Sequence, residues 1–473
     1  MSSDSIIVLL YLVVCIILGC VGIPKIRTLK DYAMGNGQFS TAVLAISMMA
    51  ACIDSFDTIG NAEKGFSMGV TFIGASLLQF VRWYIIGRLL APALPSLKAQ
   101  GCMTLVDIMG ALYGKLGRYV ATASIIFALV LLSIYYKSAA FILERYLHMD
   151  FEYAAAIVTS VIALYCIFGG VYAIVVTDVV QFFIFGIFFP IIFIWGILNI
   201  DISTVLSSLP YEKTHITSED LPTFLSICVH TLLPVLGLPY IQRLLMCERP
   251  AQVKFICNAT GIFDCIFLIM LSFMGLIVFG LNQDIKSDEA LFYFIDHAVP
   301  PPVMCFVAVA FLAVIMSTAS SFLNSLNIII VKDIVNPLFP IVKEKNLEII
   351  ATKVVGVIVA IISFNLINLK EHIIDTLWMI DNFYDPLITI PFIMALLGIR
   401  IKPHNYKYVI IISIITLLIA RYLHDDFDTI TFTAGVFASI VTILIFRDKG
   451  TNTSTAFDSY KFISNKEKLD KII

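Results

Sequence analysis

Charged residues are scarce in this chain of 473 residues. Asp, Glu, Lys and Arg make up 14% of it, whereas hydrophobic residues make up 59%. Soluble domains carry about 25% charged residues, so the composition excludes a soluble protein and predicts an all-α polytopic membrane protein whose surroundings are the lipid bilayer. The formal net charge is −3 and no basic tract occurs, so we expect no nucleic-acid partner.

Paired cysteines are also missing. The ten cysteines are scattered, mostly inside apolar runs, and no C-x-x-C pair occurs. This pattern is typical of small residues in a packed interior, and it argues against a disulfide framework or a metal site. Because no nucleophile–base pair stands out either, we expect no enzyme activity.

A cleavable signal peptide is a third absence. The N-terminus, Met1 to Asp4, lacks the basic stretch with which such peptides begin. We therefore expect the apolar run from Ser5 to Ile23 to be a retained helix.

Long apolar runs, by contrast, fill the chain. Runs of about 17–25 apolar residues predict membrane helices, and about thirteen can be distinguished. They cover residues 5–23, 41–60, 67–94, 119–145, 152–169, 173–199, 221–240, 255–281, 303–330, 350–368, 373–397, 406–422 and 428–446. We expect one transmembrane domain over residues 1–447 and a short cytoplasmic tail over residues 448–473.

Lysine and arginine are unevenly distributed between the connections. They concentrate in every second one, starting with the connection that holds Lys25, Arg27 and Lys30, and in the C-terminal segment. The positive-inside rule then predicts an outside N-terminus and a cytoplasmic C-terminus. Only three basic residues fall inside predicted spans and away from their ends, and these are Arg82, Arg88 and Lys137.

The second predicted span, 41–60, is apolar but carries Asp54, Ser55 and Asp57 near its end. A charge at the centre of a membrane helix costs about 2.5–3.5 kcal/mol. The span is therefore predicted to be an interrupted helix whose freed carbonyls and polar side chains face a cavity. The alternative is a continuous helix whose acids lie at the outer membrane interface.

The seventh predicted span, 221–240, contains Pro234, Gly237 and Pro239. Each proline removes a backbone donor and clashes with the preceding turn, so this span is predicted to be broken, although a mere kink remains an alternative. The two interrupted spans lie five helices apart. That spacing favours two five-helix repeats of opposite topology, covering about residues 41–199 and 221–397, as in many secondary transporters.

The ninth predicted span carries a stripe of small and polar side chains at helical spacing. The stripe includes Ser317, Thr318, Ser321 and Ser325. Small residues permit close helix packing, and we favour that role for Ser321 and Ser325. Two adjacent hydroxyls that face a broken helix are also suitable oxygen ligands for a hard cation, and we assign that role to Ser317 and Thr318.

At this point the sequence becomes recognisable. Residues Gly169–Gln181, which read GGVYAIVVTDVVQ, resemble the G-G-x-x-A-V-x-x-T-D-x-x-Q signature of the sodium:solute symporter family. Three other stretches are similar to that family in the same order. They are Ala50–Gly65, Pro239-x-x-Gln242-Arg243, and Ala313–Ser325 followed by Lys332-Asp333-Ile334. The resemblance implies thirteen helices, an outside N-terminus and a LeuT-like core of two inverted five-helix repeats with broken helices 2 and 7.

The resemblance also implies a site for sodium as the coupling ion. Its ligands would be the carbonyls of Ala50, Ile53 and Val314 and the hydroxyls of Ser317 and Thr318. Asp178 matches the signature aspartate and would belong to the inward sodium path; alternatively, it caps the start of the sixth span.

The substrate pocket departs from better-known members of the family. Asp57 stands where sugar transporters carry a glutamine, Ser76 stands where they carry an acidic residue, and Cys52 stands where proline transporters carry an aspartate. These differences disfavour a sugar or proline substrate. The candidate pocket residues are Asp54, Ser55, Asp57, Ser76, Lys137, His230, Trp378, Asp381 and Asp385.

The charges in this set indicate a charged or zwitterionic solute, such as an amino acid or a carboxylate. The alternative is that they satisfy one another, and Lys137 in particular is expected near a carboxylate. Asp381 and Asp385 are spaced i, i+4 and share one helix face with Trp378.

We therefore expect a sodium-coupled symporter that imports a small polar or charged solute across a bacterial inner membrane. A proton-coupled transporter of the same fold is the nearest alternative, and a membrane sensor domain is another. The oligomeric state is left open.

Overall fold

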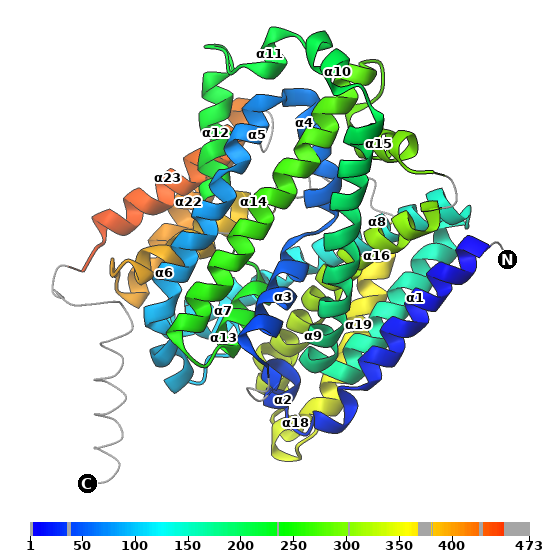
Figure 1. Ribbon diagram of the computed structural model, residues 1–473. Coiled ribbons are helices and arrows are strands. Elements are labelled where there is room, and N and C mark those ends of the chain that lie inside the picture. Colours follow the sequence, from blue (N-terminus) through cyan, green and yellow to red (C-terminus); the bar gives the residue numbers. More distant parts are fainter. Residues whose placement is uncertain are drawn as a thin grey trace, which may run out of the picture.

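The computed structural model describes residues 3–35, 39–233, 236–300, 303–367, 380, 382–424 and 429–448. These residues form helices and connections, and no β-strand occurs among them (Figure 1).

The first half of the chain contains α1 (Ser3–Cys20), α2 (Leu29–Met34), α3 (Thr41–Cys52), η3 (Phe56–Gly60), α4 (Asn61–Met68), α5 (Val70–Ser76), α6 (Leu78–Ala99), α7 (Leu105–Ala123), α8 (Ile125–Leu147), α9 (Phe151–Asn199), α10 (Ile202–Ser208) and α11 (Tyr211–Thr214). The second half contains α12 (Leu221–Leu232), α13 (Leu238–Met246), α14 (Pro250–Leu281), α15 (Ala290–Ala298), α16 (Met304–Ile329), η6 (Ile330–Val335), α17 (Asn336–Leu338), α18 (Pro340–Glu344), α19 (Glu348–Leu366), η7 (Asp385–Thr389), α21 (Ile390–Leu396), α22 (Tyr406–His424) and α23 (Thr429–Ile445).

Among the described residues, eight helices are long and apolar enough to cross a membrane, or nine if the bent pair made of α3 and η3–α4 is one span. The shorter apolar helices α12, η7–α21 and α23 coincide with predicted spans, and α9 contains two predicted spans in one helical segment. The chain is therefore a multi-pass membrane protein, while the number thirteen stays a prediction.

The motif that begins at Gly169 makes the sharp turn within α9. Gly170 has φ +52° and ψ −154°, which breaks the helical path at that residue. A side chain there would strain the backbone, and its Cβ would lie 2.8 Å from the Tyr32 ring. The two glycines therefore let the chain reverse direction against α2, and the helix that follows carries Asp178.

We expect Gly170→Ala to destabilise the protein by about 1–3 kcal/mol, because alanine must adopt a left-handed conformation and displace Tyr32. Gly186→Ala is the matched control, since Gly186 lies in a regular part of α9 and its Cβ would make only contacts of 3.8 Å or more. Thermal unfolding in detergent measures both. Equal unfolding temperatures would contradict the assigned role of Gly170.

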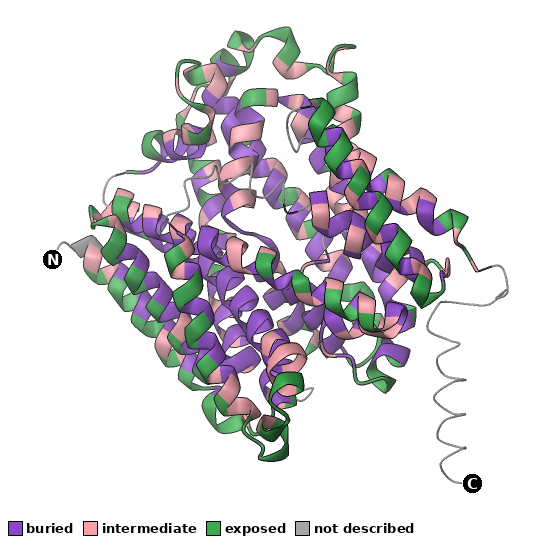
Figure 2. Ribbon diagram, turned by 180° about the vertical axis from the view of Figure 1, so that it is seen from behind, coloured by how far each residue is buried: buried purple, intermediate pink, exposed green. Residues whose placement is uncertain are grey.

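Helix α16 forms the centre of the molecule. All of its 26 residues except Met304 and Phe306 are buried, and it contacts α3, α8, α9 and α19 (Figures 1 and 2). Its small side chains allow these helices to approach closely. As a result, the hydroxyls predicted for the ninth span lie inside protein and away from lipid.

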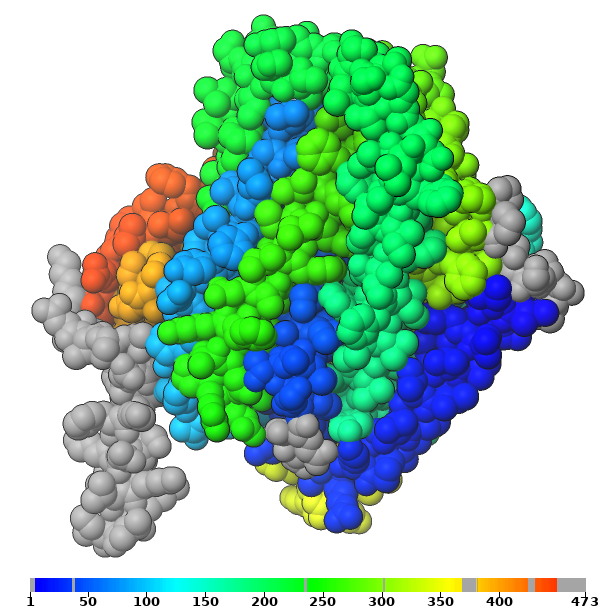
Figure 3. All heavy atoms as spheres, in the orientation of Figure 1, coloured from blue at the N-terminus to red at the C-terminus, as the bar shows by residue number. Residues whose placement is uncertain are grey.

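The surrounding helices pack in two groups. Helices α3, α4 and α6 pack on α14, while α8, α9 and α19 pack around α16. Figure 3 shows α6, α14, α3 and α9 side by side on one face. The two groups of helices meet where α3 contacts α9 and α16. Because α3 is the first half of the broken second span, the contact between the groups lies beside the break.

Both predicted interruptions are present as breaks in helices. Helix α3 ends at Cys52 and is bent by 64° from the helical segment Phe56–Met68. Helix α12 ends at Leu232, and α13 begins at Leu238 after an extended Gly237. Pro234 lies outside the described residues.

Candidate functional site

The break in the second span is stabilised by its own two acids. Asp54 Oδ1 accepts the backbone N–H groups of Phe56 (2.8 Å) and Asp57 (3.0 Å), while Asp57 Oδ2 accepts the N–H of Asp54 (3.3 Å). This reciprocal arrangement is a capping box. Asp54 Oδ2 also accepts the Tyr135 hydroxyl at 2.8 Å. The two carboxylates therefore begin the second helical half.

We expect Asp54→Ala to destabilise the break by about 1–2 kcal/mol, because the cap is lost, and to weaken sodium binding. Asp54→Asn keeps an acceptor oxygen and should lose less. Asp201→Ala is the control, since Asp201 caps the exposed helix α10 away from the cavity. Thermal unfolding with a sodium titration measures all three, and an asparagine variant as impaired as the alanine variant would rule out capping as the main role.

Where the second span is broken, backbone carbonyls without helical partners face the hydroxyls of α16. Ser317 Oγ donates to Ala50 O (2.8 Å) and to Val314 O (2.7 Å). Thr318 Oγ1 lies 3.0 Å from Ile53 O and 3.2 Å from Ala51 O. All these residues are fully buried. The structure thus brings together the five oxygens selected from the sequence and adds a sixth, Ala51 O.

Asp178 lies in a buried ion-pair network next to these oxygens. Its Oδ2 accepts Arg243 Nη2 (2.7 Å) and Ser47 Oγ (2.5 Å). The same Arg243 donates to Ser321 Oγ at 2.6 Å, one helical turn along α16 from Ser317. Asp178 therefore ties α3, α9, α13 and α16 together and does not cap the helix that begins after Gly170. Its other oxygen has no hydrogen-bond partner among the described residues.

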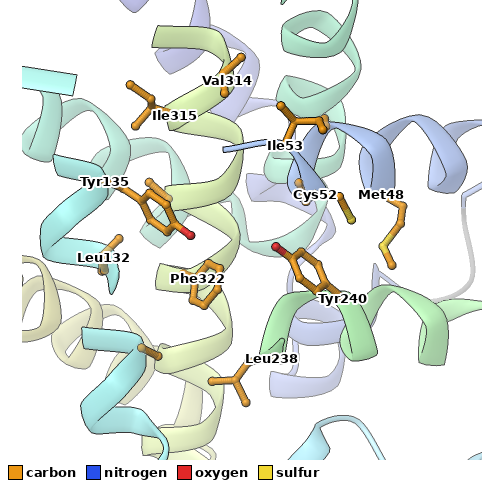
Figure 4. Packing of buried hydrophobic residues seen from close by; sticks show 14 of the residues in the cluster. Met48, Cys52, Ile53, Leu132, Tyr135, Leu238, Tyr240, Val314, Ile315 and Phe322 are labelled. Atoms are coloured by element: carbon orange, nitrogen blue, oxygen red, sulfur yellow. The ribbon is translucent and has the colours of Figure 1, made fainter. Parts of the chain in front are cut away.

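A cavity of about 1390 Å³ opens beside the break, between the two groups of helices. Five of the predicted pocket residues line it: Asp54, Ser55, Asp57, Lys137 and His230. Figure 4 shows buried residues of α3, α8, α13 and α16 near the break, with the hydroxyls of Tyr135 and Tyr240 pointing toward each other above Phe322; these three residues line the cavity.

The other predicted pocket residues are placed differently. Ser76 donates to Phe72 O of its own helix (3.2 Å), and neither Ser76 nor the buried Asp385 is part of the cavity lining. Trp378 and Asp381 lie outside the described residues. Lys137 lines the cavity as expected, but it forms no ion pair with any residue that the structure describes.

Sequence reasoning missed the contribution of α6. Gln79, Arg82 and Trp83 line the cavity, and the Trp83 indole donates to Asp264 of α14 at 2.6 Å. A signal was available, because Arg82 is one of three basic residues that lie inside predicted spans and away from their ends. The argument that selected Lys137 from that group applied equally to Arg82.

Comparisons with known proteins agree with this architecture. The model of the sodium:solute symporter family matches residues 32–407. The human sodium-coupled monocarboxylate transporter 2 is 25% identical over 350 residues, which cover 68% of this chain but only 55% of that protein. The high-affinity proline transporter PutP of Bacillus subtilis is 25% identical over 377 residues, which cover 73% of this chain and 78% of that protein.

Among solved structures, a Na+-coupled sialic acid symporter in a substrate-bound outward-open state superposes with a TM-score of 0.77. The sequences are 18% identical, and the match covers 94% of this chain and 99% of the other. This likeness confirms the predicted all-α, LeuT-like fold class.

Proposed function

Because the chain belongs to the sodium:solute symporter family, we propose that it couples the inward movement of sodium to uptake of a small solute that carries a carboxylate. Membership identifies the chain as a transporter rather than an enzyme, as the sequence predicted, and indicates sodium as the coupling ion. The transport activity of the whole protein and the class of its solute are part of this proposal.

The oxygen cluster between α3 and α16 supports this proposal most directly. Sodium is a hard cation, and carbonyl and hydroxyl oxygens are the ligands that hard cations prefer. The proposed ligands are the carbonyls of Ala50, Ile53 and Val314 and the hydroxyls of Ser317 and Thr318. In the structure these hydroxyls donate to the carbonyls, and a bound ion would accept lone pairs from both kinds of oxygen.

The position of this cluster also suggests how coupling works. Its ligands come from both groups of helices, so sodium would hold the broken second span against α16 and stabilise one arrangement of the cavity. Such coupling is reciprocal, so the solute must raise sodium affinity by the same factor. We place Asp178 on the inward path of the ion, because Arg243 links it to Ser321, one helical turn from Ser317.

The solute class follows from the relatives and the cavity together. Monocarboxylates and proline, named for two relatives, share a carboxylate, and the cavity lining contains the cations Arg82 and Lys137. We propose an outside N-terminus on the distribution of lysine and arginine, and a bacterial inner membrane on the family resemblance.

Uptake into proteoliposomes tests the function. Purified protein would be supplied with labelled lactate, pyruvate or proline under an inward sodium gradient, an inward proton gradient, or neither. We expect accumulation only with the sodium gradient. Accumulation driven by protons without sodium would favour the proton-coupled alternative instead, and equal flux without any gradient would contradict coupling.

A further inference from the structure

The two cavity acids at the helix break, Asp54 and Asp57, already have partners for most of their acceptor oxygens. Asp54 uses both carboxylate oxygens, for two backbone N–H groups and for the Tyr135 hydroxyl. Asp57 uses Oδ2 for the N–H of Asp54. These two carboxylates are therefore committed mainly to the helix break and are poorly placed to recognise a cationic solute.

The lining also holds the cations Lys64, Arg82, Lys137 and Lys286, and two of them, Arg82 and Lys137, come from the middle of predicted spans. Arg82 forms no hydrogen bond and no ion pair with any residue in the described part of the chain, although its Nε is buried. Lys137, on the other side of the cavity, also has no partner among those residues. A guanidinium with open donors on a cavity wall is costly unless a ligand or water accepts from it.

Other unpartnered polar atoms line the same cavity. Gln79 precedes Arg82 by three residues and therefore shares its face of α6, and its Oε1 is buried without a partner. Ser55 Oγ, at the helix break, is also buried without a partner. Trp83, the next residue, holds this part of α6 against α14 through Asp264, so the backbone that carries Arg82 is anchored.

From this arrangement we propose that Arg82 is the carboxylate-binding residue of the cavity, with Ser55 and Gln79 beside it, and that the apolar body of a small carboxylate faces Tyr135 and Phe322. This inference rests on the proposed function, whose solute it specifies. The planar fork of arginine matches a carboxylate with two parallel hydrogen bonds. The lining acids Asp54, Asp57, Glu63 and Asp288 balance the lining bases Lys64, Arg82, Lys137 and Lys286, so an added carboxylate would be offset by the co-bound sodium ion.

Ligand-induced thermal shifts of the purified full chain test this assignment. The probes are propionate, lactate, pyruvate and proline, with propionamide, lactamide and prolinamide as uncharged counterparts, in sodium chloride and in choline chloride. We expect at least one acid to stabilise the wild type in sodium, whereas its amide does not. Arg82→Gln should weaken binding of that acid about 10- to 100-fold.

Two further variants complete the design. Arg82→Lys keeps the charge but loses the planar fork of the guanidinium, so we expect a loss of acid affinity between those of the wild type and Arg82→Gln. If Arg82→Gln does not fold, Arg82→Lys tests the assignment in its place. Arg88→Gln is the matched control, because Arg88 lies on the same helix, is exposed and contacts Tyr84 outside the cavity. It should bind the acid as the wild type does.

Three results would overturn the assignment. They are acid binding within about twofold of wild type in both Arg82 variants, an amide that binds as well as its acid, or no response to any of the acids. Failure of sodium coupling gives a different pattern, since acid binding would then be the same in sodium and choline while the Arg82 variants still lose it.

Discussion

Replacing Ser317 and Thr318 together by alanine is expected to raise the sodium concentration for half-maximal uptake about 100-fold or more. The two hydroxyls are two of the five oxygens proposed to hold the ion, and each hydrogen bond or ligand contact to a charge contributes roughly 1.5–3 kcal/mol. A loss of about 1.4 kcal/mol corresponds to a factor of ten in affinity. The carbonyls of Ala50 and Ile53, which now accept from these hydroxyls, would also lose their partners.

Sodium titration of uptake in proteoliposomes measures this effect. Ser272→Ala is the matched control, because Ser272 is a buried serine of α14 whose hydroxyl donates to Leu268 O of its own helix. It should leave the sodium dependence unchanged. If the double variant has the sodium dependence of the wild type, the ion is bound elsewhere.

Breaking the pair between Asp178 and Arg243 is expected to have the largest effect on stability. Both side chains are buried, with exposed fractions of 0% and 5%, and either partner left alone is an uncompensated charge in the protein interior. Removal of one partner of such a pair typically costs about 3–5 kcal/mol. Arg243→Gln and Asp178→Asn should therefore each lower the unfolding temperature in detergent and the amount of protein in the membrane.

The double variant, Asp178→Asn with Arg243→Gln, distinguishes a charge effect from a packing effect. It removes both charges and leaves groups that can hydrogen-bond to Ser47 and Ser321, so we expect it to be more stable than either single variant. Such non-additivity is the signature of a direct interaction. Additive losses in the double variant would show that the pair contributes little and that the side chains act through packing.

Some of the site was predictable from local sequence alone. The break in the second span was predicted because carboxylates in an apolar run are too costly to face lipid, and the structure places Asp54 and Asp57 at the break, where they line the cavity. The family motif then singled out Ser317 and Thr318, whose hydroxyls do meet the carbonyls of Ala50 and Ile53. In both cases the decisive information lies within a few residues of the chain.

The partners of charged residues were not predictable in this way. Asp54 and Asp57 were expected to pair with Lys137 or to contact a solute, yet they cap their own helix. Arg243 was quoted only as part of a motif, although it forms the ion pair of Asp178 from 65 residues away. Ser76 was expected in the pocket but donates to its own helix, because rotation of a helix about its axis decides which face meets the cavity.

The sequence by itself therefore determined that this protein is a multi-pass helical membrane protein of this family with an interrupted second span. Long apolar runs have few alternatives in a bilayer, which requires every backbone group to be paired internally. Only the tertiary structure decided which charges are satisfied and which stay open, since Trp83 and Asp264 meet across 181 residues of sequence. Arg82 became a candidate for solute recognition only because packing against α14 turns it toward the cavity and leaves its donors without partners there.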